Sequence, residues 1–238
     1  MVRVVTVTLL ETVQLRKSFG GLDAVAGVDF SVAKGEIRAI IGPNGAGKTT
    51  FVSMIAGRIK PDSGEIKFAD QNIAGLAAHE RVRRGIAYTF QITSIYKTLS
   101  VRENVLLAAH GAGNDRDCMA RVGLADRAEQ MAGTLAYGHQ RLLEMAMGLA
   151  LRPKLLILDE PTQGLSDPEI AKFIALVREL ADEVTVLLIE HNMKVVMDVA
   201  HRITVLDQGR VLAEGSPDDI RKSVSVRNAY LGQANVEA

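Results

Sequence analysis

The alternation of apolar and polar residues divides the first part of the chain into short strand-like and helix-like stretches. Residues 4–15 and 28–32 repeat at the two-residue period of a β-strand and predict antiparallel strands of an opening sheet. The segment IRAII at residues 37–41, apolar except for Arg38, is typical of a short buried strand, and residues 65–68 predict another strand. Between the strands predicted at residues 37–41 and 65–68, a glycine-rich turn is followed by a predicted helix at residues 48–58.

The rest of the chain changes character twice. Across residues 91–151 strand patterns are absent and helix-forming residues dominate. The runs LLILD at residues 155–159 and VTVLLIE at residues 184–190 then predict buried strands, with a helix at residues 168–181 between them. Residues 203–215 predict a final hairpin.

This order of elements favours an α/β fold, in which helices cover a mainly parallel sheet. We expect one domain over residues 1–238 that opens with an antiparallel β subdomain. Its α/β core is expected at residues 1–90 and 152–238, with a helical subdomain inserted at residues 91–151.

Composition excludes several classes of protein. Lys and Arg together number 28, as do Asp and Glu, so the formal net charge is zero and bulk electrostatic binding of nucleic acid is not expected. Cys118 is the single cysteine, which excludes a disulfide framework within one chain. No apolar run approaches the roughly 20 residues of a membrane-spanning helix, and a signal-peptide cleavage pattern is absent. We therefore expect a cytosolic protein that reaches a membrane only through a partner.

A phosphate-binding loop follows the strand predicted at residues 37–41. The loop fits the pattern G-x-x-x-x-G-K-[ST] with Gly42, Pro43, Asn44, Gly45, Ala46, Gly47, Lys48 and Thr49. Its glycines let backbone N–H groups turn inward around a phosphate, and the positive end of the following helix points at the same place. Lys48 can reach the β- and γ-phosphates, Thr49 offers a hydroxyl to Mg²⁺, and Thr50 is counted as a further nucleotide ligand. Strand, loop and helix together favour a P-loop NTPase over an ordinary glycine-rich turn.

Two carboxylates lie where the strand LLILD ends. Asp159 and Glu160 would stand at the carboxyl end of a parallel strand, where ligands bind in α/β sheets. Asp159 can orient Mg²⁺ through water, and Glu160 can polarise an attacking water as a general base. Alone, such a pair could equally face solvent, but beside a phosphate loop it indicates a catalytic site.

Further motifs resemble those of the ATP-binding cassette (ABC) family of transporter ATPases. The residues that carry the resemblance are Phe19, Phe90, Gln91, Leu135, Ala136, Tyr137, Gly138, His139, Ser166, Asp167 and His191. In this order they stand at the positions of the family's adenine-stacking aromatic, glutamine loop, signature segment, D-loop and switch histidine. The resemblance extends from about residue 10 to the end of the chain.

The resemblance implies an ATPase that binds ATP and Mg²⁺ and works as a head-to-tail dimer. One subunit would supply Lys48, Glu160, His191 and Gln91, with Gln91 also coordinating Mg²⁺ beside Thr49 and Asp159. The other would supply the signature segment and the D-loop. Phe19 would stack on adenine, and its alternative is an ordinary buried phenylalanine.

The signature segment departs from the family's commonest form, LSGGQ. Ala136 stands in place of the serine, Tyr137 in place of the first glycine and His139 in place of the glutamine. Without that serine, roughly 1.5–3 kcal/mol of charged hydrogen bonding to the γ-phosphate is absent. The helix that the segment is expected to start still offers its positive end and the Gly138 N–H.

Several longer segments, among them GIAYTFQ and the ending AYLG, resemble ATP-binding subunits of branched-chain amino acid importers. Urea and amide importers of the same branch are similar. The resemblance implies permease subunits as partners, a second ATP-binding subunit that is identical or a paralogue, and indirectly a solute-binding protein. It places the chain peripherally on the cytoplasmic face of the plasma (inner) membrane. The stretch between His110 and Leu124 is shorter than family members usually have.

Two surface interpretations and two other functions stay open. Residues 95, 96, 99 and 101 (Ile, Tyr, Leu and Val) could receive a permease helix or could pack in the core. The basic run Arg81, Arg83 and Arg84 favours a solvated helix face over a lipid contact. A non-transport cassette ATPase of DNA repair or translation is one alternative function, and a P-loop kinase or GTPase is the other.

Overall fold

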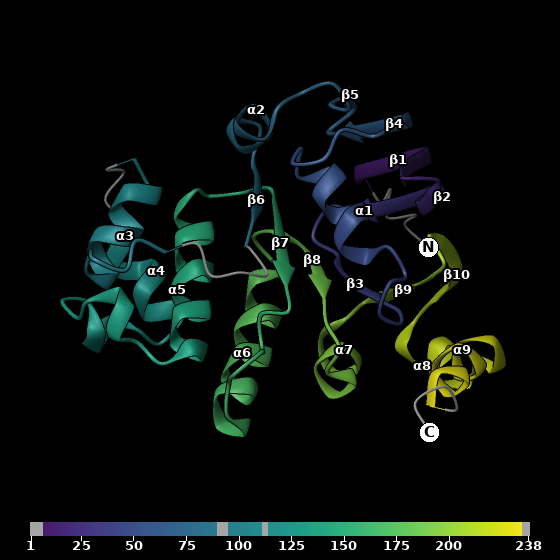
Figure 1. Cartoon of the computed structure of the whole chain (residues 1–238). Helices are drawn as coiled ribbons and strands as arrows, with labels where there is room; N and C mark the ends of the chain where they lie inside the picture. Colours follow the sequence, from purple (N-terminus) through teal and green to yellow (C-terminus); the bar gives the residue numbers. More distant parts are fainter. Residues whose placement is uncertain (1–6, 90–94, 111–113, 235–238) are drawn as a thin grey trace, which may run out of the picture. The chain divides into compact units, whose positions relative to one another are not determined.

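A computed structural model describes residues 7–89, 95–110 and 114–234, which form two compact units (Figure 1). One unit comprises Met1–Arg81 and Ala200–Ala238, and the other comprises Val82–Val199. Among the described residues, no helix is both long and apolar enough to span a membrane.

The first unit opens with an antiparallel sheet of strand order β2-β1-β4-β5. Its strands are β1 (Thr8–Phe19), β2 (Leu22–Ala33), β4 (Ser63–Phe68) and β5 (Gln71–Asn72). The antiparallel opening sheet is confirmed, but the two long strands extend further than alternation indicated. Gly20 and Gly21 take positive φ angles of 55° and 88° and close a two-residue hairpin between them.

The same unit carries the buried strand β3 (Ile37–Ile41), which lies parallel to β9 (Arg202–Asp207). β10 (Arg210–Gly215) pairs antiparallel with β9, as the predicted hairpin requires. The other helices and helical segments of this part of the chain are α1 (Lys48–Ile55), α2 (Ala78–Arg83), α8 (Pro217–Lys222) and α9 (Val224–Ala234).

The second unit contains three parallel strands in the order β8-β7-β6. They are β6 (Ile86–Tyr88), β7 (Leu155–Asp159) and β8 (Thr185–Ile189), and β7 and β8 are buried throughout. The helices are α3 (Val101–Ala108), α4 (Asp115–Arg121), α5 (Tyr137–Ala150), α6 (Asp167–Leu180) and α7 (Met193–Val199). The first three form the inserted helical group predicted between β6 and β7 (Figure 1).

The basic run that precedes β6 is only partly solvated, so the prediction for Arg81 was wrong. Arg81 is 1% exposed, and its guanidinium donates to the carbonyls of Met54 (2.6 Å) and Ile55 (2.8 Å) at the end of α1. The last carbonyls of a helix lack the usual partner four residues further on, so a buried cation there adds hydrogen bonds to them. Burial lowers the pKa of Arg81 to about 10, which leaves it charged at neutral pH. Arg83 and Arg84 are exposed, as expected.

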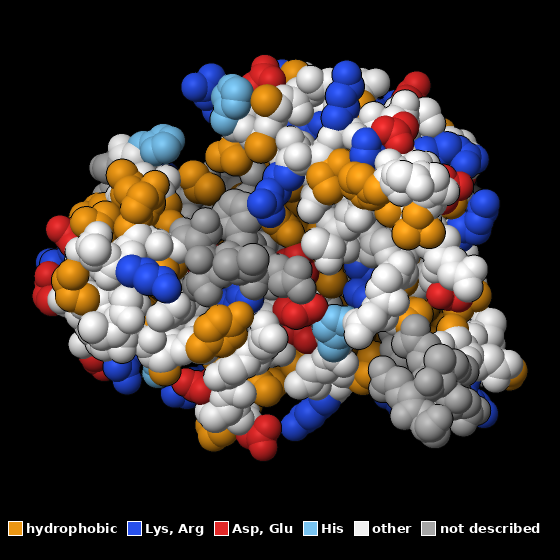
Figure 2. Space-filling view, viewed as in Figure 1, with side chains coloured by type: hydrophobic (Ala, Val, Ile, Leu, Met, Phe, Trp, Pro, Cys, Tyr) orange, Lys and Arg blue, Asp and Glu red, His pale blue; other side chains and the backbone are white. Residues whose placement is uncertain are grey.

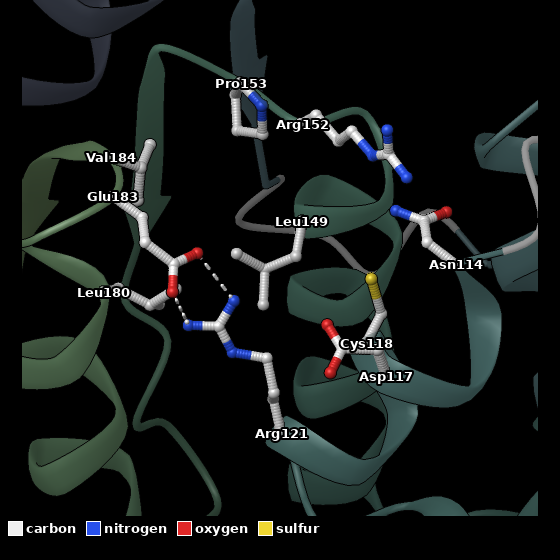
Figure 3. A pocket seen from close by; sticks show the side chains of 10 residues that line it. All are labelled: Asn114, Asp117, Cys118, Arg121, Leu149, Arg152, Pro153, Leu180, Glu183 and Val184. Atoms are coloured by element: carbon white, nitrogen blue, oxygen red, sulfur yellow. Dashed lines mark hydrogen bonds and ion pairs between the residues drawn. The ribbon is translucent and has the colours of Figure 1, made fainter.

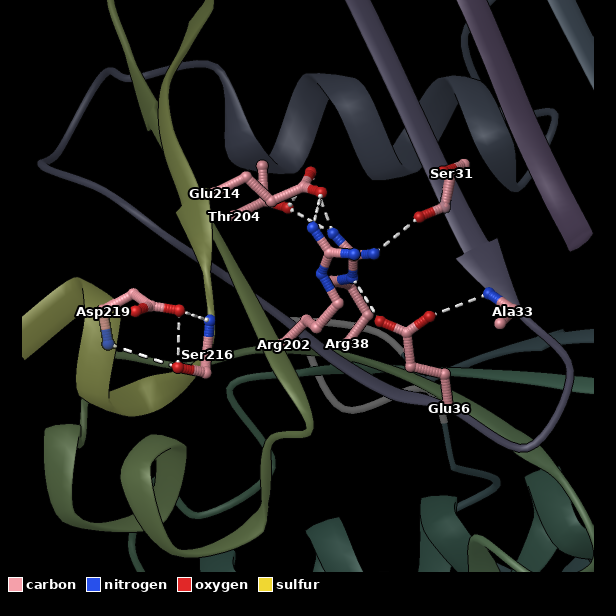
Figure 4. A network of polar contacts seen from close by, with 9 residues as sticks. All are labelled: Ser31, Ala33, Glu36, Arg38, Arg202, Thr204, Glu214, Ser216 and Asp219. Carbon is pink, nitrogen blue, oxygen red and sulfur yellow. Dashed lines mark hydrogen bonds and ion pairs between the residues drawn. The ribbon is translucent and has the colours of Figure 1, made fainter. Parts of the chain in front are cut away.

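A polar network around the buried Arg38 joins the two sheets of the first unit (Figure 4). Arg38 of β3 has a side chain 2% exposed, and it forms ion pairs with Glu36 (2.7 Å) and Glu214 (2.9 Å). Its third nitrogen donates to the Ser31 carbonyl of β2 at 2.8 Å. Glu214 also pairs with Arg202 of β9 at 2.8 Å. Every charge in this network has a partner, which is the condition for tolerating ions inside a protein.

Candidate functional site

The phosphate loop connects β3 to α1, as its sequence predicts, and close packing fixes its glycines. Gly47 caps α1 with a φ of 95°, and a Cβ on it would lie 2.1 Å from the Ala24 carbonyl oxygen. A Cβ on Gly42 would lie 2.1 Å from the Leu206 carbonyl oxygen. Side chains are therefore excluded at both positions, and the backbone can approach a bound phosphate closely.

Lys48 is buried beside this loop, where its ammonium group donates to the Gly42 carbonyl at 2.6 Å and to the Pro43 carbonyl at 2.9 Å. The cation is thus held on the loop instead of extending into solvent. Asn44, Gly45 and Thr49 are exposed, Gly47 and Thr50 are half-buried, and Ala46 is buried. The loop consequently presents a positive charge and an accessible hydroxyl next to the start of a helix, which suits a polyphosphate.

Phe19 ends β1 and is 49% exposed, so the alternative of a buried core phenylalanine was wrong. The Lys17 ammonium lies 5.3 Å from the centroid of its ring. An exposed aromatic face can stack on a planar base. Stacking on adenine stays a prediction for this residue.

The acidic pair lies in the second unit, at the end of β7. Asp159 is 1% exposed, and its Oδ2 accepts a hydrogen bond from the Tyr88 hydroxyl at 2.7 Å. Its Oδ1 is buried without a hydrogen-bond partner among the described residues. Burial raises the pKa of Asp159, the Tyr88 bond opposes that rise, and the neighbouring Glu160 adds to it. A buried carboxylate oxygen with no partner fits a site for Mg²⁺, directly or through water.

Glu160 and His191, both predicted to be catalytic, are brought together in the second unit. Glu160 Oε1 lies 2.7 Å from His191 Nε2. Glu160 takes a φ of 50°, a left-handed conformation that is uncommon for a residue other than glycine. The Glu160 side chain is 17% exposed and that of His191 48%, so a ligand can reach the pair. Gln91 and Phe90 lie outside the described residues.

The signature segment starts a helix, as expected. α5 begins at Tyr137, directly after Ala136, while Leu135 and Gly138 are buried. A Cβ on Gly138 would lie 2.6 Å from the carbonyl oxygen of Gly164, the first residue of the D-loop segment at residues 164–167, so only glycine permits this approach. The helix start therefore packs against the D-loop backbone.

Side chains also join these two segments. The Tyr137 hydroxyl donates to Gln163 Oε1 at 3.1 Å, and His139 Nε2 lies 2.9 Å from Glu169 Oε1. The backbone N–H and hydroxyl of Ser166 donate to the same Glu169 carboxylate at 2.8 and 2.6 Å. These Ser166 bonds lower the pKa of Glu169. Ser166 and Asp167 are exposed, so the signature segment and D-loop together offer one accessible surface.

Sequence reasoning missed Tyr88 and Glu190, two residues of the second unit whose side chains bond the segments that carry Asp159, Glu160 and His191. The Tyr88 hydroxyl donates to Asp159. Glu190 accepts hydrogen bonds from the backbone N–H groups of Thr162, after β7, and of His191, after β8. A signal was present for Glu190, because a carboxylate ends an otherwise apolar run. An ionisable residue at such a place needs buried partners.

The predicted permease-facing residues divide between surface and core. Exposed apolar side chains gather over α3 (Figure 2), and Tyr96 and Leu107 are 57% and 49% exposed. Val101 is fully buried, so the core alternative holds for it. Ile95 and Leu99 are half-buried.

A cavity of about 370 Å³ lies among α4, the end of α5 and the end of α6 (Figure 3). Leu149 and Leu180 form apolar parts of its wall, and Arg121 pairs with Glu183 across it at 3.0 Å. Cys118 also lines this cavity, and burial raises the pKa of its thiol. None of the described residues predicted for the site lines the cavity.

We expect Asp159→Asn to raise the unfolding temperature of the ligand-free protein at neutral pH. The substitution removes a charge that is buried with one oxygen unpaired. A gain of about 1 kcal/mol in the free energy of unfolding corresponds to a rise of about 2–4 °C for a chain of this size. Because the pKa of Asp159 is raised, its charge destabilises the fold above that pKa, and the gain should shrink as pH falls and the carboxyl protonates. Differential scanning calorimetry across pH measures both effects.

Asp62 provides a control of opposite sign. Its carboxylate pairs with Lys17 at 2.6 Å, and this hydrogen bond lowers the pKa of Asp62. Asp62→Asn should therefore lower the unfolding temperature at neutral pH. A fall for Asp159→Asn as well would contradict the assignment of a costly buried charge.

Comparison with known proteins identifies the family. Residues 25–163, more than half of the chain, match the family described as ABC transporter. The chain belongs to the ABC transporter family. It is an ATP-binding and ATP-hydrolysing subunit, as the resemblance implied, and the kinase and GTPase alternatives were wrong. Residues 210–235 match a second family, described as branched-chain amino acid ATP-binding cassette transporter.

The relatives of this ABC ATPase match it almost from end to end. The high-affinity branched-chain amino acid transport ATP-binding protein BraF of Pseudomonas aeruginosa is 40% identical, covering 95% of this chain and 98% of its own length. The corresponding protein LivG of Escherichia coli K12 is 39% identical over the same shares.

Among solved structures, the ADP conformation of MJ1267, an ATP-binding cassette of an ABC transporter, has a TM-score of 0.86 at 28% identity and covers 95% of this chain and all of its own. The dimeric post-hydrolysis state of the ATP-binding cassette MJ0796, bound to ADP and Pi, has a TM-score of 0.81 at 25% identity, covering 88% and 99%. These similarities confirm the expected fold class, a P-loop NTPase with an N-terminal antiparallel sheet and an inserted helical group.

Proposed function

We propose that this ABC ATPase powers import of branched-chain amino acids through partner permeases. The observation that carries the proposal is the match of residues 210–235 to the family described as branched-chain amino acid ATP-binding cassette transporter. The identity to BraF and LivG across nearly the whole chain supports it. Urea, amides or another small solute are the alternative cargo.

ATP binding is assigned to the phosphate loop, with Lys48 facing the phosphates and Phe19 stacking on adenine. Mg²⁺ would be held by Thr49, Asp159 and Gln91, and it would neutralise phosphate charge during cleavage. Glu160 accepts the proton of the attacking water, while His191 orients Glu160 and the γ-phosphate. The 2.7 Å contact between these two side chains supports their joint role.

ABC ATP-binding subunits of importers dimerise and work with transmembrane permeases. For this chain we propose a head-to-tail dimer, in which the joined signature segment and D-loop meet the nucleotide held by the other subunit. The second subunit is a paralogue or an identical copy. The exposed Tyr96 would contact a permease, and a solute-binding protein would deliver the cargo. The complex would place this chain on the cytoplasmic face of the plasma (inner) membrane.

Two measurements test the proposal. The purified chain should convert ATP to ADP and phosphate without a phosphoacceptor. Co-expression with any permease genes found next to its own should give a complex that carries leucine into proteoliposomes when ATP is supplied. Uptake of urea or an amide in place of leucine would overturn the proposal that the cargo is a branched-chain amino acid. Failure to co-purify with any permease would favour a non-transport ATPase.

A further inference from the structure

Glu190 follows β8 and is 4% exposed, yet it carries a carboxylate at the edge of the site. Its Oε1 accepts hydrogen bonds from the backbone N–H (3.0 Å) and the hydroxyl of Thr162. Its Oε2 accepts from the backbone N–H groups of His191 (2.9 Å) and Asn192 (3.1 Å). Both oxygens are therefore used, and each serves a different turn of the chain.

These two turns carry the proposed catalytic pair. Thr162 lies two residues after Glu160, and the other turn contains His191 itself. A second link runs between the turns, since the Glu160 N–H donates to the Ile189 carbonyl at 2.9 Å. The Asn192 side-chain oxygen also accepts hydrogen bonds from the N–H groups of Lys194 and Val195 in the first turn of α7, which fixes the far side of the second turn. The Glu190 carboxylate thus bonds the backbone of both turns, beside the direct side-chain contact between Glu160 and His191.

We propose that Glu190 is a positioning residue for ATP hydrolysis: its carboxylate sets the separation of the two turns and so holds Glu160 and His191 in contact. The inference rests on the catalytic roles proposed above for these two residues. A carboxylate is required because four donors converge on it and it offers acceptors only. Glu190 itself need not touch the nucleotide.

Glu190→Gln tests this role with little change in side-chain size. Whichever way the amide is oriented, its NH₂ group faces donors of one turn, so that turn must shift. We expect kcat for ATP hydrolysis by the full chain to fall about 10- to 100-fold, because a displacement of about 1 Å in a catalytic group has effects of this size. KM for ATP and affinity for the nucleotide should stay near wild-type values, because the phosphate loop is untouched.

Glu36→Gln is the matched control. Glu36 is likewise a buried glutamate with charged and backbone partners, but it belongs to the network around Arg38. This variant should lower the unfolding temperature without lowering kcat. A loss of kcat in Glu190→Gln that merely followed its unfolding temperature would then overturn the inference.

A double variant distinguishes positioning from a separate contribution. Single-turnover rates of ATP hydrolysis are compared with and without His191→Ala. If Glu190 acts through His191, Glu190→Gln should lower the rate by a much smaller factor in the His191→Ala protein than in the wild-type protein. Full additivity, or a wild-type kcat in Glu190→Gln, would refute the positioning role. Wild-type turnover in His191→Ala would refute the proposed catalytic roles and this inference with them.

Thr162→Val provides the test should Glu190→Gln not fold. It removes one donor to Glu190 and leaves the backbone bond, so we expect a smaller loss of kcat at unchanged KM. An unchanged kcat would then count against the proposal. Because all these assays follow ATP turnover and not uptake, they can fail independently of the proposed transport function.

Discussion

Replacing Lys48 with alanine is expected to abolish tight ATP binding. The Lys48 ammonium is already held on the phosphate loop by two backbone carbonyls, at the start of a helix that attracts negative charge. Each charged hydrogen bond that it would make to a phosphate contributes about 1.5–3 kcal/mol, so losing two corresponds to about 100-fold or more in Kd. Isothermal titration calorimetry with ATP measures this change.

Lys60 is a suitable control for that experiment, since it is an exposed lysine in the turn after α1. Lys60→Ala should leave the Kd within about twofold, as surface substitutions usually do. Wild-type affinity in Lys48→Ala would show that the loop does not bind the triphosphate.

Glu160→Gln is expected to bind ATP, to stop hydrolysing it and to accumulate as a dimer. The amide cannot accept the proton of the attacking water, and loss of a general base costs about 10²- to 10⁴-fold in rate. ATP is then retained at the subunit interface, where both subunits bind its charge. Light scattering after gel filtration in Mg-ATP measures the mass of the particle, and the same protein in ADP should be monomeric.

Ala136 complicates that test because it offers no hydroxyl to the γ-phosphate of the neighbouring subunit. The Ala136→Ser, Glu160→Gln double variant restores the hydroxyl at the start of α5 and should dimerise more tightly by about 10- to 150-fold. If the double variant stays monomeric with saturating Mg-ATP, the proposed head-to-tail dimer loses its support.

The buried strands β3, β7 and β8 and the longest helix of the α/β part could be predicted because their sequences are strongly patterned. β3 and β7 lie where their apolar-rich segments placed them, and α6 begins and ends one residue earlier than expected. The opening hairpin was less predictable. Alternation weakens near residues 16–27, and the turn at Gly20 depends on backbone angles that alternation does not encode.

The site could be predicted where a motif contains the chemistry, and not where partners come from distant parts of the chain. The phosphate loop is one continuous segment, and the glycines in its motif predict the backbone conformations that the loop adopts. Arg81 bonds carbonyls 26 and 27 residues away, and Glu190 bonds Thr162 28 residues away. Periodicity describes which face of an element is apolar, but it does not say which polar group will meet a buried charge.

The buried state of Cys118 has a practical consequence for observing this ATPase at work. As the single cysteine of the chain, it is 3% exposed, and its raised pKa keeps it in the unreactive thiol form. Maleimide dyes and nitroxide reagents attack the thiolate, so they should label it slowly. A cysteine introduced at an exposed position outside the proposed site, such as Lys60, could then carry a spectroscopic probe in an otherwise natural chain, and distances between two labelled subunits could be followed through each ATP cycle.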